Sequence, residues 1–379
     1  MARSAASGTL FAKLMQLNWL LPVLIILVGA IGVLAIYSAT DGQWNSGASQ
    51  HLTRLLIGLV FMVVIALTDI RVWFTLAYPG FIFALILLLG VEFFGVTVNG
   101  AQRWLDLGVM RIQPSELMKL AAVMALARFY HDLPAWRVSK PVGVFGALLI
   151  VFVPVILILR QPDLGTGIML AVTGVTLIFL AGINWRVIIS SATLAVITIP
   201  LFFIFGLKDY QRTRILTFLN PEHDPTGASY HIIQSKIALG SGGVSGKGFM
   251  EGSQASLNYV PENRTDFIFT VIGEEFGLIG GLGTMALYIL IIFVCFWLAS
   301  QIKQAFSQLL IMGLTMTFSL YVLINLAMIM GMVPVVGVPL PLISYGGTVM
   351  MTVLAGFGMV LSAHVHRDTE LPRGSGLLL

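Results

Sequence analysis

The stretch WLLPVLIILVGAIGVLAIY, Trp19–Tyr37, decides the structural class of this protein. It carries no charged residue, and about 20 apolar residues in a helix are enough to cross the hydrocarbon core of a bilayer. The rest of the chain is similar, since 58% of its 379 residues are hydrophobic and 10% are charged. An ordinary soluble domain has roughly 25% charged residues. The sequence therefore predicts an integral membrane protein.

Comparable apolar runs divide the chain into ten predicted spans. Their ranges are Trp19–Tyr37, Leu55–Thr68, Trp73–Phe94, Leu117–Tyr130, Val142–Leu159, Thr166–Ala181, Val187–Phe205, Phe267–Leu298, Leu309–Met330 and Val349–Ala363. They predict an all-α membrane protein with one polytopic domain over residues 1–366. Residues 367–379 are expected to form a cytoplasmic tail, part of which resembles a vector-derived sequence. The eighth span is long enough to contain a break near Gly277–Gly283.

The distribution of Lys and Arg in short loops predicts the orientation of the chain. With the N-terminus in the cytoplasm, ten basic residues lie in inside segments. Four lie in outside loops, namely Arg54, Arg103, Arg111 and Arg160. This bias predicts that both termini are cytoplasmic, so the large polar loop over residues 206–265 lies outside. Within it, Tyr230–Gly240 has the pattern of a short amphipathic helix at the membrane interface.

Several classes of function receive no support from the sequence. The net charge of +4 comes from scattered basic residues, which excludes a nucleic-acid-binding cluster. The single cysteine, Cys295, lies in an apolar run and allows no disulfide framework. No Walker loop, HExxH motif or cysteine–histidine metal motif is present. The glycine-rich GSGGVSGKG, Gly240–Gly248, instead indicates tight turns or close backbone approach.

Polar residues gather at the predicted outer ends of the spans. In QPSELMK, Pro114 can open a helix, which places Glu116 and Lys119 three residues apart on one face. They either form a structural ion pair or line a wall for a charged substrate. In RQPDLGTG, Asp163 suits the N-terminus of the next helix, while Arg160 and Gln161 add hydrogen-bond donors at the same face.

Two further groups lie on the same predicted face. Lys208, Arg212 and Arg214 suit phosphate oxygens or simple anchoring to lipid head groups. The Pro- and Gly-rich Met332–Thr348 is predicted to be a partly embedded loop, in which Ser344 and Tyr345 supply hydroxyl groups. It is either functional or a plain connection between helices.

The stretch VPENRTDFIFTVIGEEFG, Val260–Gly277, places four carboxylates beside a very apolar segment. Asp266 either caps the following helix, as Thr265 could also do, or acts as a general base in a polar groove. Glu274 and Glu275 come two to three turns deeper. An unpaired carboxylate at the bilayer centre costs about 2.5–3.5 kcal/mol or more, so both residues require internal partners.

These motifs together resemble the SEDS family (shape, elongation, division and sporulation). The resemblance is carried by QRW, QPSELMKL, QPDLGTG, FLNPEHDPTGASYHIIQS, GSGGVSGKG, VPENRTDFIFTVIGEEFG and VGVPLPLISYGG. It covers nearly the whole chain. VVGVPLPLISYGGT and the short N-terminal tail look more like elongation members than division members. Arg160 replaces the lysine that often precedes QPD in the family, which keeps the charge.

The resemblance implies a ten-helix enzyme of the bacterial inner membrane that polymerises lipid II into glycan strands and releases undecaprenyl pyrophosphate. It implies a class B penicillin-binding protein as partner, within a larger elongation complex. Asp266 corresponds to the family's essential aspartate, and Trp104 to a functionally sensitive tryptophan. The remaining expected substrate-binding residues are Arg103, Glu116, Lys119, Arg160, Gln161, Asp163, Lys208, Arg212, Arg214, Glu262, Ser344 and Tyr345.

As a hypothesis, Asp266 accepts a proton from a sugar hydroxyl while nearby cations, with Mg²⁺ or Mn²⁺ as a candidate addition, stabilise the departing pyrophosphate. Two alternatives stay open at this stage besides a division-type polymerase. A transporter that flips lipid II would distribute functional charges through the membrane. A scaffold for a partner synthase would tolerate the loss of Asp266.

Overall fold

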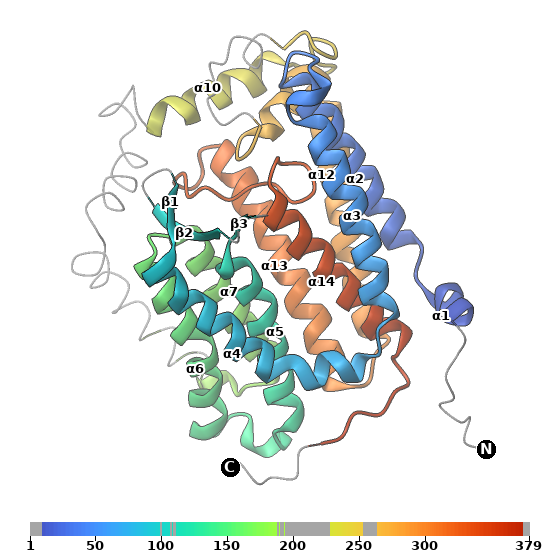
Figure 1. Cartoon of the computed structure of the whole chain (residues 1–379), viewed down its shortest axis with the longest axis vertical. Coiled ribbons are helices and arrows are strands. Elements are labelled where there is room, and N and C mark those ends of the chain that lie inside the picture. The colour runs from blue at the N-terminus through green and yellow to red at the C-terminus, as the bar shows by residue number, and fades with distance from the viewer. Residues whose placement is uncertain are drawn as a thin grey trace.

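The computed structural model describes residues 10–98, 101–106, 108, 111–187, 189, 193, 228–252 and 264–373. Its long helices form a bundle with irregular segments gathered at one end (Figure 1). The long helices are α2 (Leu20–Ser38), α3 (Ala48–Leu67), α4 (Ile70–Phe94), α5 (Pro114–Asp132), α6 (Pro141–Arg160), α7 (Leu164–Leu180), α12 (Ile268–Ser300), α13 (Ala305–Ile329) and α14 (Gly347–Val365). Each corresponds to a predicted span. The remaining prediction, Val187–Phe205, lies largely outside the described residues.

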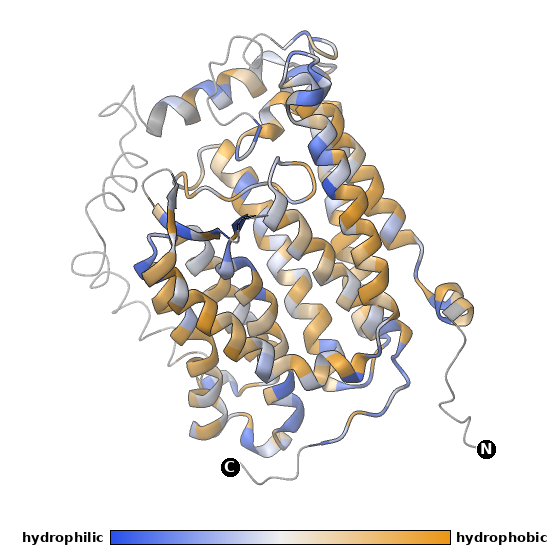
Figure 2. Cartoon of the chain, in the orientation of Figure 1, coloured by the Kyte–Doolittle hydropathy of each residue, from blue (hydrophilic) through white to orange (hydrophobic). Residues whose placement is uncertain are grey.

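The bundle has an apolar exterior along the length of its helices (Figure 2). Among the described residues, seven helices are long and apolar enough to cross a membrane, and α7 is a shorter apolar helix. Exposed side chains such as Phe83, Ile86 and Phe293 would face lipid. The prediction of an all-α, multi-pass membrane protein is confirmed.

Helix α3 begins earlier than predicted. The sequence suggests a start at Leu55, where the apolar run begins, whereas the helix starts at Ala48. Its first two turns carry the polar residues Ser49, Gln50, His51 and Arg54. An apolar run marks only the part of a helix that lies in hydrocarbon, so a polar extension beyond the bilayer escapes a hydropathy criterion.

Helix α13 lies at the centre of the bundle. It packs against α5, α7, α12 and α14. Of the residues in its apolar membrane-spanning stretch, 78% are buried, whereas the corresponding share for the peripheral α4 is 28%. Polar side chains on α13 are therefore surrounded by protein rather than lipid. This is the position that a hydrogen-bonding network inside a membrane requires.

One end of the molecule carries the short elements. Strands β1 (Val96–Val98), β2 (Ala101–Asp106) and β3 (Arg111–Ile112) form an antiparallel sheet that the sequence did not predict. Helix α10 (Ala228–Ser241), predicted over Tyr230–Gly240, and the 3₁₀ helix η1 (Trp44–Ser46) lie at the same end. Helix α1 (Leu10–Gln16) and the 3₁₀ helix η2 (Ala135–Arg137) lie at the opposite end, near the segment that follows α14 (Figure 1).

The predicted break in the eighth span is confirmed at its first position. Gly277 has φ 64° and ψ −158°, which interrupts α12. Gly242–Gly248 packs against the interruption so closely that a Cβ on Gly246 would lie 2.0 Å from the carbonyl oxygen of Glu275. The glycine-rich motif therefore serves close backbone approach, as predicted.

The segment between α13 and α14 is irregular and embedded, as predicted for Met332–Thr348. Leu340, Leu342 and Ile343 are buried in the bundle. Protein donors satisfy its backbone, since the Tyr288 hydroxyl donates to the Pro341 carbonyl at 2.5 Å and His51 Nε2 lies 3.1 Å from the Leu342 carbonyl oxygen. Irregular backbone is tolerated at membrane depth when protein surrounds it in this way. Leu342 has φ 67°, a left-handed conformation that is unusual for a branched side chain.

Candidate active site

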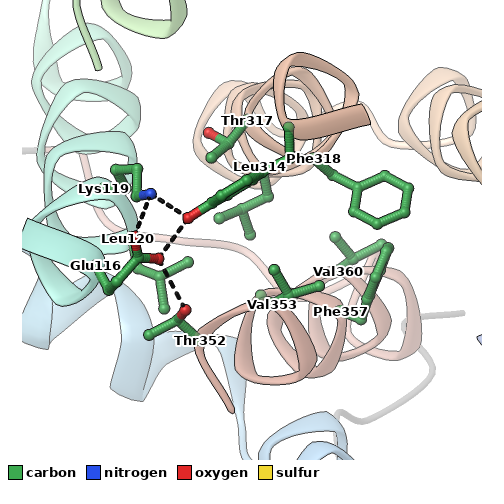
Figure 3. A pocket seen from close by; sticks show the side chains of 12 residues that line it. Glu116, Lys119, Leu120, Leu314, Thr317, Phe318, Thr352, Val353, Phe357 and Val360 are labelled. Atoms are coloured by element: carbon green, nitrogen blue, oxygen red, sulfur yellow. Dashed lines mark hydrogen bonds and ion pairs between the residues drawn. The ribbon is translucent and has the colours of Figure 1, made fainter. Parts of the chain in front are cut away.

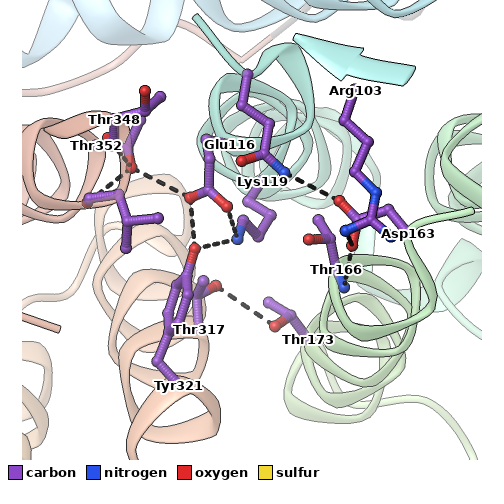
Figure 4. A network of polar contacts seen from close by, with 12 residues as sticks. Arg103, Glu116, Lys119, Asp163, Thr166, Thr173, Thr317, Tyr321, Thr348 and Thr352 are labelled. Atoms are coloured by element: carbon purple, nitrogen blue, oxygen red, sulfur yellow. Dashed lines mark hydrogen bonds and ion pairs between the residues drawn. The ribbon is translucent and has the colours of Figure 1, made fainter. Parts of the chain in front are cut away.

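Glu116 and Lys119 form a buried ion pair at the start of α5. Lys119 Nζ lies 2.7 Å from Glu116 Oε1, and their side chains are 3% and 4% exposed. Tyr321 of α13 joins both, because its hydroxyl accepts from Lys119 Nζ and donates to Glu116 Oε2. Thr352 of α14 donates to the same carboxylate oxygen at 3.3 Å. Three helices thus converge on one carboxylate (Figures 3 and 4).

A small cavity adjoins this pair. Its polar wall is formed by Glu116, Lys119 and Tyr321, and its apolar wall by residues such as Phe318 and Phe357 (Figure 3). Its volume of about 30 Å³ gives room for roughly two water molecules. The described side chains therefore leave a pocket beside the ion pair that is too small for a sugar.

A second polar group surrounds Asp163, between α6 and α7. Asp163 accepts from the backbone N–H of Thr166 at 3.3 Å, which confirms its predicted place as the cap of α7. Gln113 Nε2 donates to the same side chain at 3.0 Å, and an Arg103 guanidinium nitrogen lies 3.8 Å from it. The carboxylate therefore caps a helix and also fixes the strand segment that carries Arg103 (Figure 4).

Arg103 and Gln161 are occupied with main-chain groups in this structure. Arg103 donates to the carbonyls of Gln161, at 3.3 Å, and Pro162. The Gln161 amide donates to the Leu88 carbonyl at 2.8 Å and is buried. Arg160 is exposed, and Trp104 is half-buried in β2, opposite Val96.

Asp266 is half-buried immediately before α12. The N-cap position falls on Phe267, so neither Thr265 nor Asp266 occupies the cap position that the sequence suggested. The Asp266 carboxylate faces the α13–α14 segment, since a Cβ on Gly337 would lie 3.5 Å from its Oδ2 atom. Its main-chain carbonyl accepts from Asn325 Nδ2 at 2.7 Å.

Ser344 and Tyr345 bind the chain directly before Asp266. The Ser344 hydroxyl donates to the Thr265 carbonyl at 2.5 Å, and the Tyr345 amide donates to the Arg264 carbonyl at 2.8 Å. The Tyr345 ring lies under the Arg54 guanidinium, 4.8 Å from ring centroid to Cζ. The two predicted residues therefore position the turn at residues 264–266.

Two exposed charged residues, Asp106 and Arg111, lie where strands β2 and β3 of the sheet meet. Asp106 accepts from the Gly108 amide at 2.9 Å and pairs with Arg111 at 3.2 Å. The amide hydrogen bond, followed by the Arg111 interaction, lowers the pKa of the exposed Asp106 carboxyl. This carboxylate therefore stays ionised at neutral pH.

Glu274 and Glu275 have the internal partners that their depth demanded. Glu274 pairs with Lys247 at 2.6 Å, and Glu275 accepts from the Ser38 hydroxyl. Both carboxylates are buried, and their partners come from the glycine-rich segment and from α2. These contacts hold the interruption of α12 in place.

Some expected site residues cannot be compared with the structure. Lys208, Arg212, Arg214 and Glu262 lie outside the described residues. Conversely, sequence reasoning missed Tyr321, Asn325 and Thr352. A signal was available, because a polar side chain within a membrane span is costly and therefore suggests a function.

The mechanism raised Mg²⁺ or Mn²⁺ as a candidate addition. Mg²⁺ usually keeps several waters and is bound by one or two carboxylates together with substrate phosphates. No group of three or more His, Cys, Asp and Glu residues converges in the described ranges. The proposed step uses protein side chains and routes nothing through a metal ion.

Comparison with known proteins places these features in a family. The family described as cell cycle protein, which includes FtsW, RodA and SpoVE, matches residues 15–369. The peptidoglycan glycosyltransferase MrdB of Escherichia coli K12 is 45% identical over 334 residues, covering 88% of this chain and 90% of MrdB. A probable peptidoglycan glycosyltransferase FtsW of Trichlorobacter lovleyi is 32% identical, covering 92% of this chain and 93% of that protein.

A solved structure has the same fold. It belongs to a peptidoglycan synthase complex described as coordinating polymerization and crosslinking, and it superposes with a TM-score of 0.81 at 29% identity. The match covers 93% of this chain and 99% of that chain. The chain therefore belongs to the FtsW/RodA/SpoVE family, as a peptidoglycan glycosyltransferase of the RodA/MrdB type.

Proposed function

We propose that this glycosyltransferase polymerises lipid II into glycan strands at the outer face of the bacterial inner membrane, with Asp266 as the general base. The observation that carries the proposal is the location of Asp266. It is half-buried where a membrane-spanning helix begins, and its carboxylate faces an embedded loop. A partly desolvated carboxylate at the membrane boundary suits a substrate whose prenyl chain cannot leave the bilayer.

The proposed step is an inverting displacement. Asp266 accepts the proton of the 4-hydroxyl group of an acceptor N-acetylglucosamine. The freed oxygen forms a bond to the anomeric carbon of the donor N-acetylmuramic acid, while the bond from that carbon to the pyrophosphate oxygen breaks. An α linkage becomes β, and undecaprenyl pyrophosphate leaves. A correctly placed base contributes typically about 10²–10⁴-fold to such a rate.

Lys119, Arg103, Arg212 and Arg214 are the candidate cations for the departing pyrophosphate, and two of them are already engaged in protein contacts. Lys119 is enclosed by Glu116 and Tyr321, and Arg103 is bonded to main-chain carbonyls. Each would have to exchange a protein partner for pyrophosphate. We propose that Lys119 mainly sets the charge and geometry of Glu116, and that Arg212 and Arg214 remain candidates to meet the phosphates.

The family supports a role in cell elongation, with identity to MrdB higher than identity to the FtsW relative. The solved relative from a complex that polymerises and crosslinks supports a class B penicillin-binding protein as partner, alongside other elongation-complex proteins. We propose an orientation with both termini in the cytoplasm and with α10 and the sheet outside. The assignment of residues 1–366 to one domain is also a proposal.

The decisive experiment measures polymerisation of labelled lipid II by the purified full-length protein, with and without its partner. Penicillin blocks crosslinking in the assay, and moenomycin is included because the resemblance implies resistance to it. Asp266→Asn should lower the rate by about 10²-fold or more, since it removes the base. Asp69→Asn is the matched control, because Asp69 caps α4 by accepting from the Arg71 amide. Helix α4 begins at the end of the molecule opposite the sheet and α10 (Figure 1).

Wild-type polymerisation by Asp266→Asn would reject the base assignment. Movement of labelled lipid II across liposome membranes without polymer formation would support the transporter alternative. Loss of activity in both Asp→Asn variants would point to general damage and count against a specific role for Asp266.

A further inference from the structure

Tyr321, Glu116 and Lys119 form a polar group in which each side chain contacts the other two. Its hydroxyl contacts both charged side chains, and the Lys119 ammonium lies 4.2 Å from the centroid of its ring. The whole group is buried, and the adjoining cavity has room for roughly two water molecules beside it. Tyr321 therefore limits where the Lys119 ammonium and the Glu116 carboxylate can lie.

Asn325 binds two separate main-chain segments. Its Nδ2 atom donates to the carbonyls of Asp266 and Val338, both at 2.7 Å, and the residue is 0% exposed. Both neighbours are acceptors, so the amide nitrogen must be the atom that faces them. Asn325 consequently ties the backbone at Asp266 to the embedded α13–α14 segment.

Tyr321 and Asn325 stand four residues apart on α13. Residues i and i+4 of a helix lie on one face, separated along the axis by roughly 6 Å. The same face of the central helix thus binds the Glu116–Lys119 pair with one side chain and the backbone of Asp266 with the other.

We propose that Tyr321 and Asn325 are positioning residues that hold the Glu116–Lys119 pair and Asp266 in a fixed spatial relation. The inference rests on the proposed function of Asp266. A general base must lie about 2.6–3.2 Å from the atom whose proton it accepts. A displacement of about 1 Å can lower a rate about 10²-fold. Rigid anchors beside Asp266 meet that demand where a flexible loop would not.

The test compares kinetic constants for lipid II polymerisation by the full-length protein carrying Tyr321→Phe or Asn325→Asp. The first removes one hydroxyl and keeps the ring, and the second keeps the size but turns an oxygen toward two carbonyls. Ser319→Ala is the control on the same helix, because its hydroxyl donates only to the Thr315 carbonyl within α13. Rates are divided by the fraction of protein that binds fluorescent lipid II.

Each positioning variant should lower kcat about 10- to 100-fold. KM should change about twofold or less, because uniform binding of substrate is retained. Ser319→Ala should keep both constants. Wild-type kcat in well-folded Tyr321→Phe and Asn325→Asp would overturn the inference, as would a fall in apparent kcat that disappears once rates are divided by the fraction of protein that binds fluorescent lipid II. If Asn325→Asp does not fold, the smaller Asn325→Ser replaces it.

Asp266→Asn, assayed in parallel, separates this inference from the proposed function. Full activity of Asp266→Asn would reject the proposed base itself. An inactive Asp266→Asn protein together with unimpaired positioning variants would leave the base in place and reject only the anchoring role of α13.

Discussion

Glu116 and Lys119 show how a membrane protein can hold charge in its interior. Removing two ions from water costs several kcal/mol per ion, and mutual attraction repays this only with good geometry and further hydrogen bonds. Here the further bonds come from Tyr321 and Thr352. The pair therefore depends on contacts supplied by three helices.

Removing one partner of this pair should destabilise the fold. Lys119→Met leaves the Glu116 carboxylate buried without its cation, so we expect a loss of about 3–5 kcal/mol in the free energy of unfolding. Thermal unfolding of the detergent-purified protein measures it as a lower Tm. The double variant Glu116→Gln/Lys119→Met should be less destabilised than the sum of the single changes, because neither charge remains. Strict additivity would contradict the pair's coupling.

The interruption of α12 is the feature that most depends on a neighbouring element. The amides of Lys247 and Gly248 donate to the carbonyls of Glu274 and Glu275, both at 3.0 Å. In return, the Leu278 amide donates to the Gly243 carbonyl at 3.0 Å. Backbone groups left unsatisfied away from water cost several kcal/mol each. The glycine-rich segment thus completes the hydrogen bonding of a broken membrane helix.

Gly246→Ala should disrupt this pairing. Gly246 has φ +83°, and an added Cβ would meet the Glu275 carbonyl at 2.0 Å. Strain of the backbone alone costs about 1–3 kcal/mol, and displacement of α12 adds to it. Tm of the purified protein measures the effect. Gly240→Ala is the matched control, because a Cβ there meets nothing within 4 Å and Gly240 lies in α10. Equal Tm values for the two variants would contradict the close approach.

At the scale of the whole molecule, the bundle has two chemically different ends. One end carries the sheet, α10 and the embedded loop, and the other carries α1 and η2 (Figure 1). Asp266 lies at the first of these ends, because its carboxylate faces Gly337 of the embedded loop. Between the two ends, the helices are mainly apolar along their length in the view of Figure 2. A substrate with a prenyl chain and a polar head could therefore keep each part in its preferred medium while meeting the candidate site.

The proposed orientation can be measured by cysteine labelling. Cys295 is fully buried, so it should stay unreactive and needs no replacement. Val244→Cys and Trp136→Cys introduce thiols at positions that are 66% and 65% exposed. Val244 lies in the segment that follows α10, and Trp136 lies in η2, between α5 and α6, at the opposite end of the molecule (Figure 1). In cells stripped of their wall, a membrane-impermeant maleimide should label Val244→Cys at once and Trp136→Cys only after permeabilisation. The reverse pattern would invert the assigned topology.

The sequence alone determined the spans, the break in α12 and the cap of α7, because each of these depends on residues close together in the chain. Apolar runs of bilayer length specify the spans, Gly277 permits the break, and Asp163 caps the helix that directly follows it. The depth of Glu274 and Glu275 even predicted that they need partners. Each of these conclusions depends on neighbours in the chain or on the bilayer, which the sequence implies by composition.

The tertiary structure alone decided which polar groups meet. Tyr321 contacts Lys119 across 202 positions of the chain, and Asn325 contacts Asp266 across 59. In the folded chain the N-cap of α12 is Phe267 rather than Thr265 or Asp266. Arg103 donates hydrogen bonds to main-chain carbonyls, which the sequence did not indicate. Such pairings arise from how helices pack side by side, and the periodicity of one helix carries no information about which face of another it will meet.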